Sequence, residues 1–408
     1  MSTRWTWFSG LAVVGTLVLG GAGPAPAQQV VKLGDGETLT IGGLISGSLF
    51  TNKGFFGSFG QGQNAEWAAV PGAASQPGTD NTFLEGDVRN TRIRFEFAGS
   101  PVLGKWFPKG VLESDFFGTS GAPPFGDEQP QLRIRLAYAD LTNGRTTIRI
   151  GQFWSPMFGE VPVSVTHIAF PLGYGATGMV GWRFPGIFLY HDLAPGKKVS
   201  AQLQLAVMEG SGPTAGATDG TYGIGNGEAS GLPQLEARLN FAKKSPNLAW
   251  TLYFVGHIDW KDTTGSGVES DNLTGTGFEA GANIAPGKLT LHGNFYTGKA
   301  LGQQFAHITQ QGNVRGMGMW IQAGFDVSPR LGLWAFYGMD DPDEDQFATD
   351  NPGVAGGLLR HKNETLSGML RFRAGRYALG LEYFRANTTW STGTTHATQI
   401  SLSVLYTI

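Results

Sequence analysis

Arginine recurs at every second position in several segments of the chain. Arg92 and Arg94 form one pair, Arg133 and Arg135 form another, and Arg149 follows shortly after. A guanidinium group stays charged at physiological pH and presents a planar fork of donors that fits a carboxylate. This spacing favours the binding of anions, because arginine neither exchanges its proton nor acts as a nucleophile under these conditions.

Residue types needed for covalent or metal chemistry are scarce. The chain has no cysteine, its 7 histidines are scattered, and neither G-x-S-x-G nor H-E-x-x-H occurs. The acidic run 340–345 lacks the spacing of an EF-hand, so we interpret it as a solvated loop and leave calcium binding open. We therefore expect no enzyme activity, catalytic residue, metal or cofactor. A net charge of −3 gives no reason to expect a nucleic-acid partner.

Apolar and polar residues alternate with a period of two along most of the chain. Ile93 and Phe95, for example, alternate with Arg92 and Arg94. Such segments have one face for an apolar medium and one for water. We predict about sixteen strands, many of them about 10 residues long, as a tilted membrane strand requires. They lie near 38–50, 88–98, 109–117, 131–141, 145–152, 178–191, 198–208, 233–241, 248–260, 274–284, 287–297, 314–327, 330–339, 363–374, 376–386 and 397–408.

The connections between these strands alternate between short turns and long polar loops. The long loops are predicted at 51–87, 118–130, 153–177, 209–232, 261–273, 298–313, 340–362 and 387–396. Short turns on the periplasmic rim and long loops on the extracellular rim are typical of outer-membrane barrels. The predicted fold class is all-β, a transmembrane antiparallel β-barrel.

Residues 1–27 predict an export signal. Arg4 precedes an apolar run that begins at Phe8, and Ala25-Pro26-Ala27 is a small-residue cleavage pattern. We expect residues 1–27 to be a cleaved signal peptide and residues 28–408 to form one transmembrane barrel. The expected location is the bacterial outer membrane, in contact with membrane lipid and lipopolysaccharide.

In such a barrel the polar face lines a water-filled lumen. The residues predicted to line the pore and set its selectivity are Arg92, Arg94, Arg133, Arg135, Arg149, Glu113, Asp115, Arg238, Arg371 and Arg373. Two interpretations stay open. Either the acids and bases pair and keep the wall hydrated and rigid, or the arginines attract anionic solutes into the pore.

The predicted loop 153–177 is aromatic and apolar, unlike the other long loops. We expect it to fold inward after the fifth strand and narrow the lumen. Packing over a rim or at a subunit contact is the alternative. The residues predicted to form the constriction are Phe153, Trp154, Phe158, Glu160 and His167.

Four short pieces occur in order along the arginine-rich part of the chain. They are R-N-T-R-I-R-F at 89–95, L-E-S-D-F-F-G at 112–118, R-I-R-L-A-Y at 133–138 and G-Q-F-W-S-P at 151–156. Through them the stretch 84–190 resembles the outer-membrane porins, and most closely the DcaP-like porin family. This resemblance implies a homotrimer of sixteen-stranded barrels, a constriction loop after the fifth strand, and passive diffusion of small anionic solutes such as dicarboxylates.

The favoured functional hypothesis is thus a passive diffusion channel for small hydrophilic solutes, with a preference for anions. One alternative is a structural or adhesive barrel whose lumen the apolar loop closes. Another is a barrel enzyme, whose catalytic residues would have to come together across strands.

Overall fold

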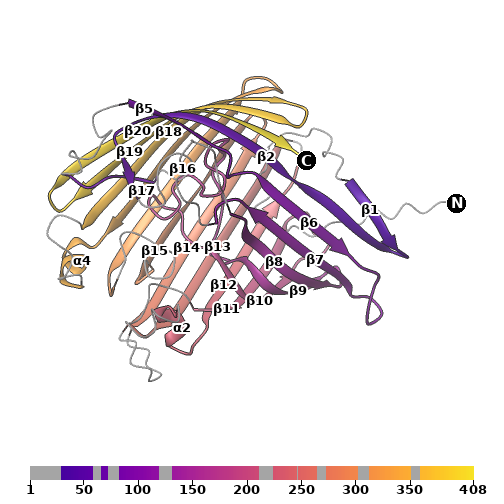
Figure 1. Cartoon of the computed structure of the whole chain (residues 1–408). Coiled ribbons are helices and arrows are strands. Elements are labelled where there is room, and N and C mark those ends of the chain that lie inside the picture. Colours follow the sequence, from indigo (N-terminus) through magenta and orange to yellow (C-terminus); the bar gives the residue numbers. More distant parts are fainter. Residues whose placement is uncertain are drawn as a thin grey trace.

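The chain forms a barrel that closes on itself (Figure 1). The computed structural model describes residues 29–57, 66–71, 82–118, 131–210, 224–245, 247–263, 273–301, 312–350 and 359–408. The barrel is antiparallel and has 16 strands. Consecutive strands pair with each other, and β20 (Gly393–Thr407) pairs with β2 (Glu37–Lys53) to close the ring. The predicted fold class is therefore confirmed.

The other strands of the wall follow in chain order between β2 and β20. They are β6 (Arg92–Ala98), β7 (Phe107–Asp115), β8 (Arg133–Thr142), β9 (Thr146–Trp154), β10 (Arg183–Asp192), β11 (Ser200–Met208), β12 (Gln234–Lys243), β13 (Leu248–Lys261), β14 (Leu273–Pro286), β15 (Leu289–Lys299), β16 (Arg315–Asp326), β17 (Leu331–Pro342), β18 (Arg360–Ala374) and β19 (Tyr377–Trp390). Two short helices, α2 (Asn226–Ala229) and α4 (Glu344–Asp350), lie between strands. In the described residues no helix is long and apolar enough to span a membrane.

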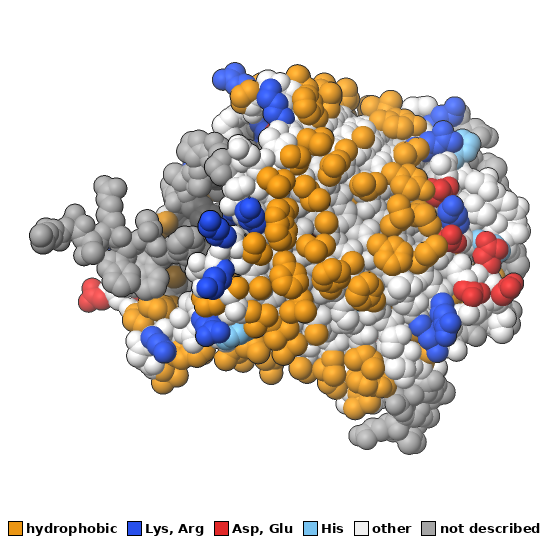
Figure 2. Space-filling view, turned by 180° about the vertical axis from the view of Figure 1, so that it is seen from behind, with side chains coloured by type: hydrophobic (Ala, Val, Ile, Leu, Met, Phe, Trp, Pro, Cys, Tyr) orange, Lys and Arg blue, Asp and Glu red, His pale blue; other side chains and the backbone are white. Residues whose placement is uncertain are grey.

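The outer wall of the barrel is apolar (Figure 2). Ile321 and Leu402 point outward and are 50% and 49% exposed, whereas their strand neighbours Gln322 and Ser401 are buried inside. A wall with apolar side chains outside and polar side chains inside has the reverse of the arrangement found in a water-soluble protein. It suits hydrocarbon surroundings, where closure also leaves no unpaired strand edge.

Three short pairings near the N-terminus were not predicted. β1 (Gln29–Gly34) pairs with the start of β2, beyond the point where β20 ends. β5 (Thr82–Asp87) lies in the predicted loop 51–87 and pairs with the far half of β2, in line with β6. β3 (Phe56–Gly57) and β4 (Trp67–Ala68) form a separate two-residue ladder. The predicted strand 88–98 therefore began too early, because residues 88–91 form a turn between β5 and β6.

The loop after the fifth barrel strand folds inward as predicted, but its bounds are 155–182 rather than 153–177. The β9–β10 ladder continues as far as the pair Trp154 and Arg183. Phe153 and Trp154, which were predicted to belong to the constriction loop, therefore lie in β9. Both rings are buried on the inner face of the barrel.

Two further expectations were wrong. In the predicted strand 131–141 Leu136 alternates with Arg133 and Arg135 and was therefore expected to face outward, but a register shift in the β7–β8 ladder changes the phase of the strand and buries it. The long loop expected at 387–396 is a two-residue connection, because the β19–β20 ladder continues to Trp390 and Gly393. Much of the predicted loops 118–130, 209–232, 261–273, 298–313 and 340–362, and all of 1–27, lie outside the described residues.

The acidic run 340–345 does not act as one cluster. The Asp340 side chain faces inward and accepts a hydrogen bond from the Tyr296 hydroxyl. Asp343 accepts a hydrogen bond from the Gln346 N–H (3.0 Å) at the start of α4. Within the described ranges no group of three or more His, Asp or Glu side chains is placed to hold a metal ion.

Candidate functional site

The connection between β9 and β10, residues 155–182, lies inside the barrel, and we call it the lumen loop. The Ser155 N–H donates to the Trp182 carbonyl (2.7 Å), which holds the two ends of the loop together at the wall. Most of its residues are buried. Buried peptide groups need hydrogen-bond partners, and here side chains of the wall supply many of them.

The first contacts of the lumen loop are with β12. The Met157 N–H donates to the Glu236 carboxylate (2.7 Å), and Arg238 donates to the Pro156 carbonyl (2.9 Å). The Arg238 guanidinium also lies 3.8 Å from the centre of the Tyr253 ring. Arg238, predicted to line the pore, thus contacts the loop directly.

The next contacts are with β14, β15 and β16. The Glu160 carboxylate accepts a hydrogen bond from the Asn283 amide (2.6 Å) and lies 3.2 Å from the His292 imidazole. Gln322 accepts from the Val163 N–H (2.7 Å) and donates to the Val163 carbonyl (2.8 Å). Glu160, predicted as a constriction group, therefore points to the opposite wall and is held there.

Glu382 on β19 holds the turn of the lumen loop. Its buried carboxylate accepts three hydrogen bonds, from the Ser164 hydroxyl (2.7 Å), the Val165 N–H (2.6 Å) and the Thr166 N–H (2.8 Å). Hydrogen bonds to an ionised acceptor are stronger than those between neutral groups. Three such bonds make Glu382 the strongest single tether of the loop.

The returning part of the loop is held from two more positions. Asn90, just before β6, donates to the Thr166 carbonyl (2.7 Å) and accepts from the Ala169 N–H (2.9 Å). Asn363 on β18 donates to the Ala176 carbonyl (3.2 Å). The lumen loop is consequently bonded to the wall along most of its length, from β12 round to β6.

Two of the predicted constriction residues in the loop are fully enclosed. Phe158 stacks on Trp154, with ring centres 3.7 Å apart. The His167 ring lies 4.9 Å from the Phe384 ring and is 3% exposed. Burial lowers the pKa of His167 to about 4. His167 is therefore neutral at pH 7 and adds no charge to the lumen.

The predicted arginines of β6 and β8 meet around Glu113 on β7. Arg94 lies 3.1 Å from the Glu113 carboxylate, Arg135 lies 3.0 Å from it and Arg92 lies 3.7 Å from it. The neighbouring strands bring these side chains to one face, as the alternation predicted.

Asp115 and Asp140 hold the remaining predicted arginines of this wall. Asp115 pairs with Arg133 (2.7 Å) and with Arg135 (2.8 Å). Arg149 forms a separate pair with Asp140 (2.7 Å), an acid that the sequence analysis did not single out. We call the inner wall from β6 to β10 the arginine wall. Much of it is thus an ion-pair network, as the first of the two interpretations proposed.

Arg183 at the start of β10 was missed. It is 6% exposed, and its guanidinium packs against the rings of Trp182 (4.2 Å) and Trp154 (4.9 Å), which contact each other edge to face. No carboxylate lies within ion-pair distance of it among the described residues, and its Nε and Nη1 have no hydrogen-bond partner there. The signal in the sequence was a cation next to a tryptophan within the predicted strand 178–191.

Positive charge is in excess on this wall. The guanidinium groups of Arg92, Arg94, Arg133, Arg135 and Arg183 outnumber the carboxylates of Glu96, Glu113 and Asp115. Glu96 also pairs with Lys109, which adds a further positive charge. Nε and Nη2 of Arg92 also have no hydrogen-bond partner in the described part of the chain. Buried cations with too few counter-charges are costly, and an anion that accepts these hydrogen bonds would lower that cost.

The last two predicted arginines lie elsewhere, on β18. Arg371 is buried beside Trp334, with its guanidinium 4.9 Å from the ring centre. Arg373 lies 3.4 Å from Asp326. β19, β20 and β2 separate β18 from β6 in the barrel, so these two arginines do not belong to the arginine wall.

The barrel is similar to solved structures of outer-membrane channels. The outer membrane channel DcaP of Acinetobacter baumannii matches with a TM-score of 0.67 at 15% identity, over 91% of this chain and 98% of that one. OmpF of Salmonella typhi matches with a TM-score of 0.55 at 11% identity, over 93% of this chain and 100% of that one. An anion-selective porin from Comamonas acidovorans matches with a TM-score of 0.53 at 12% identity, over 91% and 100%.

These likenesses establish the porin fold. The likeness to DcaP that the four sequence pieces predicted is confirmed as a likeness of structure. No protein-family model matches the chain, and no curated protein matches its sequence.

Replacing Glu382 with alanine should loosen the lumen loop. The Val165 and Thr166 amides would lose a charged acceptor, and such a bond contributes about 1.5–3 kcal/mol. We expect their hydrogen exchange to become at least about tenfold faster in the refolded barrel. Glu364→Ala is the control, because Glu364 accepts from the Tyr337 hydroxyl and does not hold the loop. Equal exchange at both amides in Glu382→Ala and the native chain would contradict the tether.

Acid should also loosen the loop, through His167. An undocked loop would bind a proton with the ordinary histidine pKa of about 6.5, whereas the docked one does so only at about 4. The undocked form binds more protons in between, so docking weakens as the pH falls through this window. The chain has no native cysteine, so a spin label on Val161→Cys reports the loop alone. Its mobile fraction should rise between pH 7 and pH 4.

The control for this experiment is His167→Leu in the same labelled chain. It lacks the titrating ring and should lose most of the rise between pH 7 and pH 4. A rise of equal size and midpoint in both chains would assign the acid response to a carboxylate instead.

Proposed function

We propose that the chain is an outer-membrane porin, a passive diffusion channel for small hydrophilic solutes. The observation that carries this proposal is a closed barrel with an apolar outer wall, a charged inner wall and a loop tethered inside the lumen. Export would use residues 1–27 as a cleaved signal peptide. The barrel would then lie in the outer membrane, in contact with lipid and lipopolysaccharide.

We further propose that the channel prefers anions. The unpaired nitrogens of Arg92 and Arg183 lie on a wall with excess positive charge. Two guanidinium groups with free donors suit a solute with two acidic groups, such as a dicarboxylate, because each carboxylate takes one fork of donors. The Comamonas acidovorans neighbour is described as anion-selective, which supports the same direction.

One observation favours a second candidate, a structural barrel with a closed lumen. The lumen loop is bonded to wall strands on several sides, and its side chains are largely buried. A loop held in this way reduces the free cross-section of the lumen. Conductance distinguishes a narrowed pore from a closed one.

The mature chain, refolded and inserted into a planar bilayer, should give stable conductance steps. Under a KCl gradient the reversal potential should favour chloride. The double variant Arg92→Gln and Arg183→Gln should lower the chloride-to-potassium permeability ratio several-fold, because it removes the excess charge on the arginine wall. The control Lys299→Gln with Arg315→Gln removes two charges at strand ends and should change the ratio little.

Other outcomes of this recording have separate meanings. Stable steps that favour potassium would keep the porin and reject the preference for anions. Absence of steps from a barrel that migrates as a folded, heat-modifiable species would favour the closed structural barrel.

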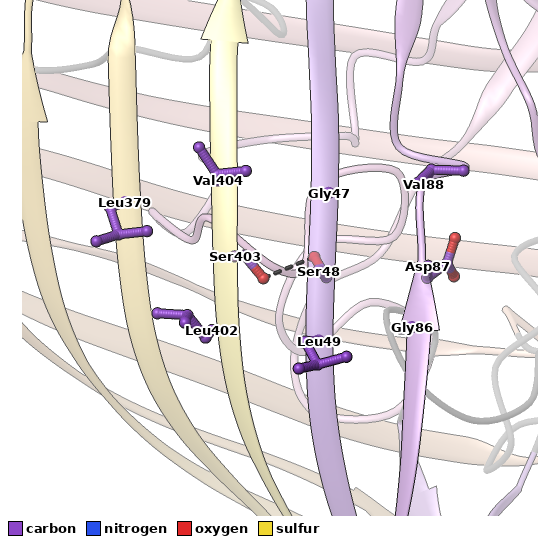
Figure 3. A pocket seen from close by; sticks show the side chains of 10 residues that line it. All are labelled: Gly47, Ser48, Leu49, Gly86, Asp87, Val88, Leu379, Leu402, Ser403 and Val404. Carbon is purple, nitrogen blue, oxygen red and sulfur yellow. Dashed lines mark hydrogen bonds between the residues drawn. The ribbon is translucent and has the colours of Figure 1, made fainter.

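The outer wall carries a groove that suits contact between copies (Figure 3). The groove has a volume of about 540 Å³ and is bordered by Leu49, Leu402 and Val404. Gly47 and Gly86 leave it open because they lack side chains. We propose that the chain forms a homotrimer through this face; OmpT of Vibrio cholerae, a similar barrel, has a structure described as a trimer form.

Light scattering of the detergent-solubilised barrel should give the mass of a trimer. Gly86→Phe should shift it to the monomer, because the ring fills the groove; a Cβ there comes no closer than 3.5 Å to another atom, so the barrel itself tolerates it. Gly368→Phe is the matched control, since Gly368 lies in β18 and a Cβ there has no neighbour within 4 Å. A native monomer would reject the trimer, and a trimeric Gly86→Phe variant would place the contact on another face.

A further inference from the structure

The hairpin turns at one rim of the barrel are basic, whereas the connections at the other rim contain no lysine or arginine. Every hairpin turn from β6–β7 to β18–β19 at the first rim contains at least one basic residue. These residues are Lys105, Arg145, Lys197, Lys198, Lys244, Lys288, Arg330 and Arg376. The eight connections at the other rim are 54–81, 116–132, 155–182, 209–233, 262–272, 300–314, 343–359 and 391–392. All of them except 300–314 and 391–392 contain acidic residues.

The barrel topology gathers these turns into one ring, the basic rim. Lys197, Lys198, Lys244 and Lys288 are exposed, and none of them forms an ion pair with an acid of the described chain. Arg145 donates to a main-chain carbonyl, that of Asp192 (3.1 Å), so its charge is not balanced by a carboxylate. At these positions the rim therefore carries positive charges without an ion-pair partner in the described residues.

Apolar side chains lie beside the basic ones in the same turns. Leu193 and Val199 flank Lys197, and they are 48% and 38% exposed. Leu103 precedes Lys105 and is 85% exposed. In Figure 2 the left edge of the apolar belt is bordered mainly by basic side chains, whereas basic and acidic side chains mix at the right edge. A long basic side chain next to exposed apolar groups fits the level where hydrocarbon meets lipid headgroups, because its stem lies along the apolar part and its charge reaches the phosphate.

We propose that the basic rim binds the headgroups of anionic phospholipids in the inner leaflet of the membrane. This inference rests on the proposed function, which places the short turns on the periplasmic side. A basic residue near an anionic membrane surface contributes about 1 kcal/mol, and the effect acts within a Debye length of about 10 Å. Soluble anions are a poorer fit, because the basic side chains of the rim stand beside lipid-facing apolar groups. The rim therefore fixes the depth of the barrel and selects its boundary lipids.

The barrel in phosphatidylcholine vesicles, probed with spin-labelled lipids, tests this inference. Spin-labelled phosphatidylglycerol should associate with the barrel about three times more strongly than spin-labelled phosphatidylcholine at low salt. The ratio should fall toward one at about 1 M NaCl, where the Debye length is about 3 Å. The variant that combines Lys197→Gln, Lys198→Gln, Lys244→Gln and Lys288→Gln should lose at least half of the excess association of phosphatidylglycerol over phosphatidylcholine.

A matched control removes four basic residues at the opposite rim. It combines Lys53→Gln, Lys299→Gln, Arg315→Gln and Lys362→Gln, and it should leave most of the excess in place. A native ratio near one at low salt would overturn the proposal, as would an equal loss in the control and the turn variant. Both variants should keep the conductance steps of the native channel, so failure of lipid binding and failure of the porin function are separate results. If the turn variant does not fold, the salt dependence of lipid association with the native barrel still tests the proposal.

Discussion

The structure depends on one constraint, that a peptide group buried away from water must find a hydrogen-bond partner inside the protein. The strands meet it by closing into a ring, with β20 paired to β2. The lumen loop has no strand beside it, so it meets the same constraint with side chains of the wall. Glu382, Gln322 and Asn90 bond directly to its main chain. Part of the polar inner wall is therefore there to fold the loop and is not available to a solute.

The charged side chains of the lumen also fall into two groups, those that hold the structure together and those with donors left unpaired in the described residues. Glu113 and Asp115 hold most of the arginine wall in place, and a paired guanidinium offers few donors to a passing anion. The rigid ion-pair network and the proposed attraction for anions would thus rest on different residues of one wall. The surplus lies at Arg92 and Arg183, whose nitrogens keep donors without partners in the described structure.

The sequence predicted the barrel and the inward loop because both follow from local patterns. Period-two alternation defines the strands. An apolar loop among polar ones must bury its side chains against another part of the protein. The sequence did not predict the tethers, because Glu382 and Val165 are 217 positions apart and no spacing rule joins them. Arg183 was missed for a similar reason. Its importance comes from Trp154 and Trp182, which only the β9–β10 ladder and the closing loop bring together against it. The predicted strand ends were wrong where a ladder continued past residues that are unusual in strands, as at Gly393.

The loop also changes the chemistry of the wall from which it starts. Trp182 is its last residue, and the bond from Ser155 fixes that end beside β9. Arg183 follows directly, and its guanidinium packs against both indole rings, which exclude water from it. A charge in such surroundings acts on an anion more strongly than the same charge in water, because the effective dielectric constant is lower. Under the proposed function, the segment that narrows the lumen would therefore also strengthen the cation beside it, and size selection and charge selection would come from the same fold of the loop.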